Sequence, residues 1–430
     1  MHDDSTLSFS TLRQDSLLIG EYELDSSYAS WMANSTASIS ATAYFPSADL
    51  VTLLEEDATN LILQRKLVSP LTDEELFRDI SASYRNRKSD SHALLTLKGY
   101  KATPNQDRSI LVRFSVNATN TKTKGVKNHK QSNEALLMGI FDGHGDQGHK
   151  VSQYVALELP KVFGRTIEQQ QQLTGASTAS TQINPVDPRY NNLISQVFKA
   201  TFLKIDANEP IQGSGGGTTA STFFYPGIGP NLYLANVGDS TTIIAHYSTS
   251  SRRSTIVKQN RRDKPHLPEE RKRIEESGGT VYIPFQLKTK GSQGPEESSR
   301  LLITLEDGST LGLAMSRSIG DVEGKKFGLV AEPTVDVFDV EQYYLEQQFS
   351  KQQMKESEWF AAVASDGLYD VIPRIEVIQS LGESLFGRSS IECTCEVLIR
   401  KAGRLWIRNT AASPYRDDIT LGVSKIWLKY

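Results

Sequence analysis

Two Asp-Gly pairs in this sequence each follow an apolar run that is typical of a buried strand. Asp142-Gly143 comes after the run LLMGIF, and Asp366-Gly367 comes after the run WFAAVAS. A carboxylate at the end of a core strand is held by rigid backbone, and the glycine behind it allows a sharp turn that exposes a carbonyl oxygen. Oxygen atoms brought together from two such strand ends are suitable ligands for a hard divalent cation. The first hypothesis is therefore a metal-dependent enzyme.

Further acidic residues stand at two more predicted strand ends. Asp239 follows the run LYLANVG, and Asp417-Asp418 precede a last predicted strand at 419–423. A single Asp before Gly is most often only a turn residue, but four acidic strand ends in one chain make that interpretation much weaker. With His144 nearby and no cysteine in these segments, the oxygen ligands favour Mg²⁺ or Mn²⁺ over zinc.

Composition excludes several classes of protein. The 430 residues are 38% hydrophobic and 8% aromatic, which suffices for a core, and the net charge of −4 predicts no nucleic-acid partner. The only two cysteines, Cys393 and Cys395, exclude a disulfide framework and fit a reducing compartment. No run approaches the ~18 apolar residues of a membrane span, and no signal peptide is recognisable. We therefore expect a soluble monomer of the cytoplasm or nucleus, with no membrane partner.

The elements that position these residues begin near residue 91. Residues 1–90 are rich in Ser and Thr, and we expect an N-terminal extension that is either disordered or packed on the body, with one helix starting at Thr72. From 91 to 430, strand candidates occur in neighbouring pairs, which is typical of antiparallel sheets with separate helices. Helices are predicted from about Val151, and at 268–278, 374–386 and 391–408. Polar inserts expected as surface loops are 117–133, 167–188, 286–299 and 341–357.

Taken in order, eight short motifs form a recognisable series. They are Pro104-Asn105-Gln106-Asp107, Phe141-Asp142-Gly143-His144-Gly145, Gly216-Gly217-Thr218-Thr219-Ala220, Ala235-Asn236-Val237-Gly238-Asp239-Ser240, Asp263-Lys264-Pro265, Leu313-Ala314-Met315-Ser316-Arg317-Ser318-Ile319-Gly320-Asp321, Ala364-Ser365-Asp366-Gly367-Leu368-Tyr369-Asp370 and Asp417-Asp418-Ile419-Thr420. Over about residues 95–428 the series resembles the metal-dependent PP2C family of protein serine/threonine phosphatases. The ordered set is highly specific, whereas one member alone would be a weak signal.

The resemblance implies a fold and a ligand set. The expected fold is α+β, a four-layer α-β-β-α sandwich of two antiparallel sheets flanked by helices, with a two-metal centre at one end. By the same resemblance, Asp142 bridges two ions of Mg²⁺ or Mn²⁺, and the Gly143 carbonyl binds one of them. Asp366 and Asp417 bind the other ion, and Asp418 is the neighbour of a ligand.

Three more residues receive roles from the resemblance. Asp239 supports a third, weaker metal site, and Asp107 acts through metal-bound water. Hydroxide bridging two cations attacks phosphorus in line, so no covalent phosphoenzyme is needed. His144 is the candidate general acid for the departing alkoxide; the alternative is a loop histidine bonded to backbone.

The phosphate contacts depart from the family's pattern. Many members carry a phosphate-binding Arg five residues before the Asp of the first motif, and here that position is Ala102, while Gln106 replaces the usual Glu. Lys101 or Arg108 is the candidate for supplying the positive charge, although a Lys lacks the bidentate fork of an Arg. For Arg317, a structural ion pair is favoured over a phosphate contact.

A flap is expected at about 248–310, beside the active site. Its Arg252-Arg253 and Arg261-Arg262 pairs either attract acidic phosphopeptides or are merely solvated surface. Asp263 stands where the family usually has a His. The expected function is hydrolysis of phosphoserine and phosphothreonine in phosphorylated proteins. The rivals are a catalytically weak or dead family member that serves as a binding scaffold, and a phosphatase for small phosphoesters.

Overall fold

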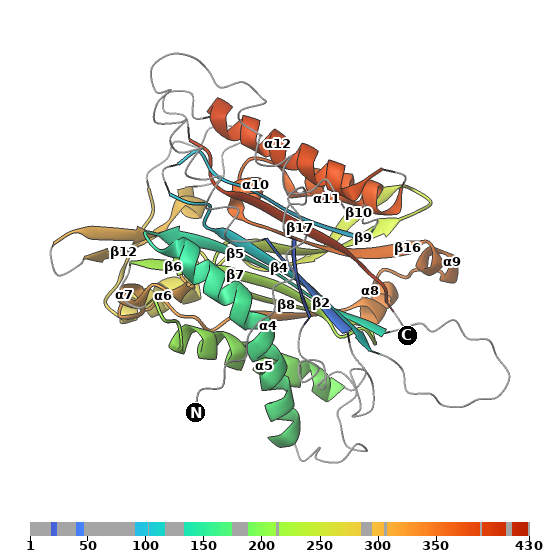
Figure 1. Ribbon diagram of the computed structural model, residues 1–430, viewed down its shortest axis with the longest axis horizontal. Helices are drawn as coiled ribbons and strands as arrows, with labels where there is room; N and C mark the ends of the chain where they lie inside the picture. Colours follow the sequence, from blue (N-terminus) through green and yellow to red (C-terminus); the bar gives the residue numbers. More distant parts are fainter. Residues whose placement is uncertain are drawn as a thin grey trace.

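The fold is a stack of two antiparallel sheets with helices on both outer faces (Figure 1). The computed structural model describes residues 19–23, 40–46, 91–101, 103–116, 133–173, 188–211, 215–284, 295–304, 308–387, 389–409 and 415–428. The α+β four-layer sandwich predicted from the sequence is confirmed. None of the helices described has the length and apolar character needed to cross a membrane.

The larger sheet has nine strands. In spatial order the main path is β1 (Ile19–Glu23), β2 (Ser40–Pro46), β4 (Asp107–Val116), β5 (Asn133–Gly145), β7 (Ala220–Tyr225), β8 (Asn231–Val237) and β15 (Thr334–Asp339), while β6 (Gly216–Thr218) pairs with β5 and β14 (Ile319–Gly320). Helices α4 (Gly148–Leu173) and α5 (Pro188–Ala207) cover its outer face (Figure 1). Phe163 and Phe198 of these helices pack against Phe224 of β7.

The second sheet carries the other pair of long helices. Its order is β10 (Arg253–Gln259), β9 (Thr241–Ser248), β16 (Ser357–Ala364), β17 (Ile419–Ile426) and β3 (His92–Leu97), and it is covered by α11 (Arg374–Phe386) and α12 (Ile391–Asn409). The central layer between the sheets is built from alternating apolar residues of both, such as Met138, Phe223, Ile244 and Ala361. The helices predicted at 374–386 and 391–408 are therefore confirmed almost to the residue.

The predicted flap contains a small sheet of its own at one end of the sandwich (Figure 1). It consists of β11 (Thr280–Tyr282), β12 (Arg300–Thr304) and β13 (Thr310–Leu313), with α6 (Pro268–Glu276) and the short helix η2 (Pro295–Ser298) beside it. Ile274, Leu301 and Leu313 belong to a separate apolar cluster that holds this unit together. Its mobility stays a prediction.

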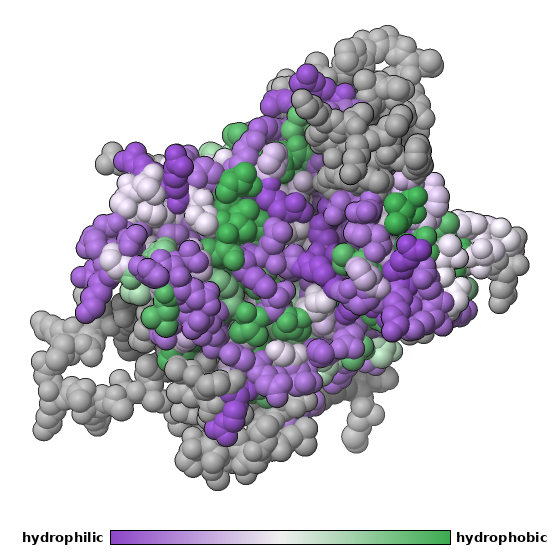
Figure 2. Space-filling view, turned by 180° about the vertical axis from the view of Figure 1, so that it is seen from behind, coloured by the Kyte–Doolittle hydropathy of each residue, from purple (hydrophilic) through white to green (hydrophobic). Residues whose placement is uncertain are grey.

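Part of the N-terminal extension belongs to the larger sheet. The sequence analysis assigns no strand before residue 91, but β1 pairs with β2, and β2 pairs with β4. The helix predicted at Thr72 lies outside the described residues, as does most of the insert at 117–133. On the face seen in Figure 2, hydrophilic residues predominate and hydrophobic ones form small groups, which is normal for a protein surface.

Three predicted surface loops are partly helical, so those predictions are wrong; in the described part of the insert at 286–299, the helix is the short η2. Helix α4 continues through Gln169–Gln172, because Gln is a good helix former once a helix has started. The insert at 341–357 contains α8 (Val340–Glu346) and α9 (Lys351–Lys355). Asp339 caps α8, and Ser350 with Gln353 forms a capping box on α9. The capping residues could have predicted both helices, but the polar composition of the insert is typical of a loop.

Buried Glu270 anchors α6 to the segment before β14. Its carboxylate accepts hydrogen bonds from Arg317 at 2.6 Å, from Arg273 at 2.7 Å and from the Ser316 hydroxyl at 2.7 Å. Burial acts to raise the pKa of Glu270, but the bonds from Arg317 and Arg273 outweigh it and lower the pKa to about 2. Arg317 is therefore in the structural ion pair that the sequence analysis favours.

We expect Glu270→Ala to lower the free energy of unfolding by about 3 kcal/mol, because it removes a buried carboxylate and leaves the partly buried guanidinium groups of Arg317 and Arg273 uncompensated. Urea titration measures the change. Glu276→Ala, on the exposed side of the same helix, is the matched control and should change stability by no more than about 0.5 kcal/mol. Equal effects of the two substitutions would contradict the anchoring role.

Candidate metal centre and active site

Asp142 lies within strand β5, directly opposite Asp107, the first residue of β4. The prediction that Asp142 ends its strand is wrong, because the next three residues continue the strand by pairing with β6. Gly143 allows the backbone of Gly148 and of Gln106 to lie close to this part of β5. A Cβ atom there would lie 2.5 Å from the carbonyl oxygen of Gly148 and 2.7 Å from that of Gln106. The two carboxylates are thus fixed by the pairing of rigid strands.

Asp107 has one satisfied and one unsatisfied carboxylate oxygen. Its Oδ2 accepts hydrogen bonds from the hydroxyls of Ser365 at 2.8 Å and Thr420 at 2.7 Å. Its Oδ1 is buried and has no hydrogen-bond partner among the residues described. Desolvation, followed by the negative charge of Asp418, raises the pKa of Asp107 to about 7. An oxygen of this kind is suited to a cation or to a water molecule bound to one.

The acidic residues predicted from four distant segments are brought together around Asp142. Desolvation raises the pKa of Asp142 well above its ordinary value, and four neighbouring carboxylates raise it further. In order of influence these belong to Asp107, Asp366, Asp417 and Asp239. Asp366, the first residue of the short helix α10 (Asp366–Tyr369), has its pKa raised well above the ordinary value for the same reasons. The site therefore concentrates negative charge.

The two adjacent aspartates before β17 have different surroundings. Asp418 is buried and accepts hydrogen bonds from the backbone N–H groups of Gly99 at 2.5 Å and Gln106 at 2.9 Å. Asp417 is half-buried and accepts a hydrogen bond from Lys101 Nζ at 2.8 Å, while that Nζ lies 3.0 Å from Asp418. The backbone bonds give Asp418 a structural role, which leaves Asp417 as the better candidate ligand.

Asp239 differs from the other carboxylates because two cations compensate its charge. Lys264 Nζ donates a hydrogen bond to Asp239 Oδ2 at 2.5 Å, and a guanidinium nitrogen of Arg262 lies 3.8 Å from the same oxygen. Burial acts to raise the pKa of Asp239, but Lys264 and then Arg262 outweigh it and lower the pKa to about 2. This pairing makes Asp239 a weaker candidate ligand than Asp142 or Asp366.

The donor set fits a hard divalent cation. Every candidate side chain offers carboxylate oxygens, which Mg²⁺ and Mn²⁺ prefer, and a cation would relieve both the repulsion around Asp142 and the unsatisfied Oδ1 of Asp107. Within the described ranges, no group of three or more His, Cys, Asp or Glu side chains already forms a metal-binding cluster. The carboxylates are therefore neighbours that influence one another's charge and not a closed coordination cage.

His144, on β5 beside Asp142, forms a pair with Asp321 that the sequence analysis missed. His144 Nε2 lies 2.6 Å from Asp321 Oδ2. Burial acts to lower the pKa of His144, but Asp321 outweighs it, and the pKa is raised. A hydrogen bond to the backbone of Asp142 makes a smaller contribution to raising the pKa of the imidazole. Gly217 leaves room for this contact, because a Cβ atom there would collide with the Asp321 carboxylate.

Comparison with known proteins identifies the family. A family model described as protein phosphatase 2C matches residues 103–404. The chain belongs to the protein phosphatase 2C family. Probable protein phosphatase 2C 41 of Arabidopsis thaliana is 26% identical over 357 residues, which are 81% of this chain and 91% of the relative. Probable protein phosphatase 2C 64 of Oryza sativa subsp. japonica is 26% identical, over 64% of this chain and 54% of the relative.

A solved structure is similar to this PP2C in fold. The serine-threonine phosphatase 2C from Toxoplasma gondii has a TM-score of 0.53 at 16% identity, and the match covers 78% of this chain and 94% of that structure. The resemblance inferred from the motifs is thus confirmed. By family, this PP2C is a protein serine/threonine phosphatase of a class that depends on Mg²⁺ or Mn²⁺.

The candidate phosphate-binding cations of this PP2C are engaged elsewhere. Arg108 is buried, and its guanidinium donates hydrogen bonds at 2.8 Å to the carbonyl oxygens of Asn105 and Asp107 and at 2.7 Å to Gln153. Lys101 is paired with the two aspartates before β17. Ala102 lies outside the described residues. Roles for Lys101 and Arg108 in binding phosphate stay predictions.

Asp263 stabilises the turn before Asp239. Its Oδ2 accepts hydrogen bonds from the backbone N–H of Gly238 at 3.1 Å and from Asn236 Nδ2 at 2.9 Å. Gly238 has a φ of +100°, a conformation that other residues rarely adopt. Asp263 therefore has a positioning role in this PP2C.

We expect Asp321→Asn to move the alkaline limb of the pH–rate profile to lower pH. The carboxylate of Asp321 raises the pKa of His144, whereas burial lowers it, so removing the negative charge leaves a histidine that loses its proton earlier. The pH dependence of kcat for a phosphothreonine peptide measures the shift. An unchanged alkaline limb would show that His144 does not control it. Ser318→Ala, which removes a hydroxyl bonded to Asp321 but no charge, serves as the control.

Proposed function

We propose that this PP2C hydrolyses phosphoserine and phosphothreonine side chains of proteins at the cluster around Asp142. The observation that supports this most strongly is the convergence of five carboxylates from separate segments beside His144. These belong to Asp107, Asp142, Asp239, Asp366 and Asp417. None of the acidic positions that the family's motifs require is replaced.

The residues that would hold cations are Asp142, Asp366 and Asp417, with the Gly143 carbonyl; Asp239 would support a third, weaker site. When bound, Mg²⁺ or Mn²⁺ ions would activate water as the nucleophile near neutral pH and would offset charge on the phosphoryl oxygens. The strand pairing of β4 with β5 keeps Asp107 and Asp142 in fixed register, so little reorganisation is needed when substrate binds.

His144 would deliver the proton to the departing alkoxide. Its Nε2 is held by Asp321, so the ring nitrogen left to carry the transferred proton is Nδ1. The raised pKa of His144 makes the imidazolium more populated than it is in an ordinary histidine at the same pH. A serine or threonine alkoxide is a poor leaving group, so this proton is the main contribution of His144.

The alternative is a weakly active or inactive family member that serves as a binding scaffold. Two observations favour keeping it as a second candidate: Lys101 is paired with Asp417, and Lys264 is paired with Asp239. Each lysine competes with a divalent cation for the carboxylate that it contacts. A scaffold of this kind would bind phosphoproteins without releasing phosphate.

Hydrolysis of a phosphothreonine peptide and of p-nitrophenyl phosphate, each with Mn²⁺, separates these functions. A protein phosphatase cleaves the peptide with the higher kcat/KM, a phosphatase for small phosphoesters cleaves only p-nitrophenyl phosphate, and a scaffold cleaves neither. Failure to release phosphate from the peptide, while calorimetry shows Mn²⁺ bound, would overturn the proposed activity.

A further inference from the structure

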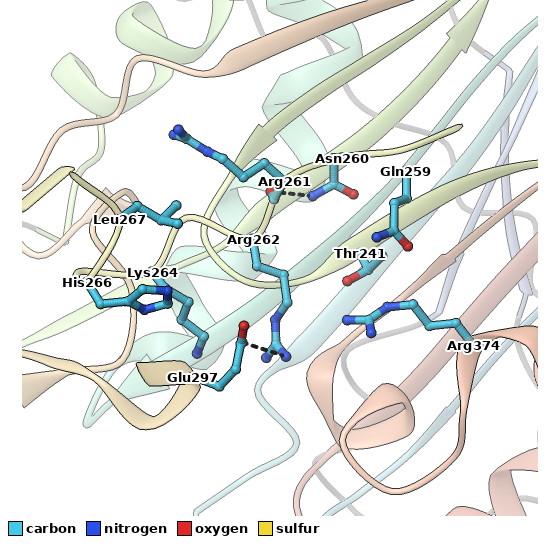
Figure 3. Close-up of a pocket in the computed structure, with 10 residues that line it drawn as sticks. All are labelled: Thr241, Gln259, Asn260, Arg261, Arg262, Lys264, His266, Leu267, Glu297 and Arg374. Atoms are coloured by element: carbon cyan, nitrogen blue, oxygen red, sulfur yellow. Dashed lines mark hydrogen bonds and ion pairs between the residues drawn. The ribbon is translucent and has the colours of Figure 1, made fainter. Parts of the chain in front are cut away.

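A cationic pocket of about 430 Å³ lies beside the candidate metal centre (Figure 3). It is bounded by the loop after β10, the short helix η2 and the first residue of α11. Arg261, Arg262, Lys264 and Arg374 are among the ten residues that line it, and Glu297 is the one acidic member of that set. Lys264 and Arg262 also compensate the charge of Asp239, but nothing in the proposed hydrolysis accounts for Arg374.

Arg374 is the least compensated cation in the pocket. Among the residues that the structure describes, no carboxylate forms an ion pair with Arg374, and its buried Nε has no hydrogen-bond partner. The guanidinium lies over the ring of Tyr369, 5.5 Å from its centroid. Desolvation and the charge of Arg262 lower the pKa of Arg374, although Asp370 and Glu297 act in the opposite direction. A guanidinium in this state gains the most from a bound anion.

Arg262 links the pocket to the candidate metal centre. Its Nε donates a hydrogen bond to the backbone oxygen of Asp239 at 3.0 Å, and its Nη1 lies 3.1 Å from Asp370 and 3.8 Å from Glu297. These contacts hold the side chain in place. Figure 3 shows Arg262 extending from the loop after β10 and Arg374 from the start of α11, both into the pocket. Two guanidinium groups that line one pocket can bind the same oxyanion.

We propose that the Arg262–Arg374 pocket binds a second anionic group of the phosphopeptide, close to the residue that is dephosphorylated. This inference rests on the proposed phosphatase function and assigns that site a substrate class, which is acidic or doubly phosphorylated segments. The shared chemistry is an oxyanion, either a phosphate or a carboxylate. Arg261 is the less available of the two neighbouring arginines, because it is paired at 2.9 and 2.7 Å with the fully buried carboxylates of Asp263 and Glu270. The nearest carboxylate to Arg262 belongs to Asp370, which is partly exposed and lies 3.1 Å away.

The test compares peptides that differ at one position near a phosphothreonine. With full-length protein and Mn²⁺, kcat/KM is measured for peptides carrying phosphoserine, Asp or Asn at each of the three residues on either side. At the spacing that reaches the pocket, we expect kcat/KM for at least one anionic peptide to be about tenfold higher than for the Asn peptide. A phosphoserine preference identifies phosphate as the ligand, and equal preference for Asp identifies any oxyanion.

In Arg374→Gln, we expect the ratio of kcat/KM for the anionic peptide to kcat/KM for the Asn peptide to fall to about two or less. Arg374→Lys, which keeps the charge without the bidentate fork, should retain part of this ratio. The matched control is Arg271→Gln, which removes an exposed Arg on α6 that is paired with Glu275 outside the pocket; it should keep the full ratio. A wild-type ratio near one at every spacing, or an unchanged ratio in Arg374→Gln, would overturn the proposal.

A binding measurement keeps this inference separate from the proposed activity. Fluorescence anisotropy in EDTA follows a labelled peptide that carries Asp at the preferred spacing, or at each spacing in turn if no peptide is hydrolysed, and an Asn peptide as reference. Affinity that depends on Arg374, together with no hydrolysis of any peptide in the Mn²⁺ assay, supports the pocket and contradicts the phosphatase. Hydrolysis without any dependence on Arg374 supports the phosphatase and contradicts the pocket.

Discussion

Replacing Asp142 by Asn is expected to lower the Mn²⁺-dependent kcat/KM for a phosphothreonine peptide by at least about 10³-fold, because cations held by this carboxylate supply several kcal/mol of transition-state stabilisation. The same substitution should stabilise the protein in EDTA. Desolvation and four neighbouring carboxylates raise the pKa of Asp142, so a neutral amide of the same shape removes a repulsion. We expect an increase in Tm of about 2–4 °C.

Asp146→Asn is the matched control, since Asp146 is exposed and only four positions further along the chain. It should change neither activity nor Tm appreciably. Mn²⁺ should also raise the Tm of the wild type much more than that of Asp142→Asn. A substitution at Asp142 that lowers activity but also lowers Tm in EDTA would indicate a structural carboxylate and not a ligand.

His144→Gln is expected to separate substrates by their leaving groups. Loss of the general acid should lower kcat for a phosphothreonine peptide by about 10²–10⁴-fold. The p-nitrophenolate ion leaves without a proton, so kcat for p-nitrophenyl phosphate should fall by less than about tenfold, since the assistance of a general acid matters little there. Steady-state kinetics with both substrates and saturating Mn²⁺ measures the contrast.

His149→Gln removes the next histidine of the chain, on α4, and should leave both activities near the wild-type values. An equal fall of both activities in His144→Gln would contradict the proton transfer, because it would point to damage at the neighbouring Asp142. Loss of the fold is checked by the circular dichroism spectrum of each variant.

The layers and the acidic cluster were predictable because they depend on local patterns. Apolar runs of strand length carry their flanking aspartates to sheet ends, and the ordered motifs relate those ends to a known family. Asp366 and Asp142 come from such runs, and the structure places them within each other's electrostatic influence. The acidic cluster could therefore be predicted from the local patterns and the family's fold, without knowledge of individual contacts between distant residues.

Contacts across large sequence separations were not predictable in the same way. Asp321 lies 177 residues from His144, and no pattern near either residue relates them. Arg262 and Arg374 likewise meet only because the loop after β10 and the start of α11 are adjacent in space. The same holds for β2, which pairs with β4, and for β1, which pairs with β2. Their positions depend on the open edge of that sheet and not on their own weak signals.

The most direct test of the account is metal removal and return in one preparation of the full-length protein. We predict that EDTA abolishes release of phosphate from a phosphothreonine peptide, and that Mn²⁺ restores it as calorimetry records at least two ions bound per chain. Asp366→Ala should bind fewer ions and stay inactive. Hydrolysis that persists in EDTA, or in Asp366→Ala, would contradict the central claim that these carboxylates hold the cations on which the reaction depends.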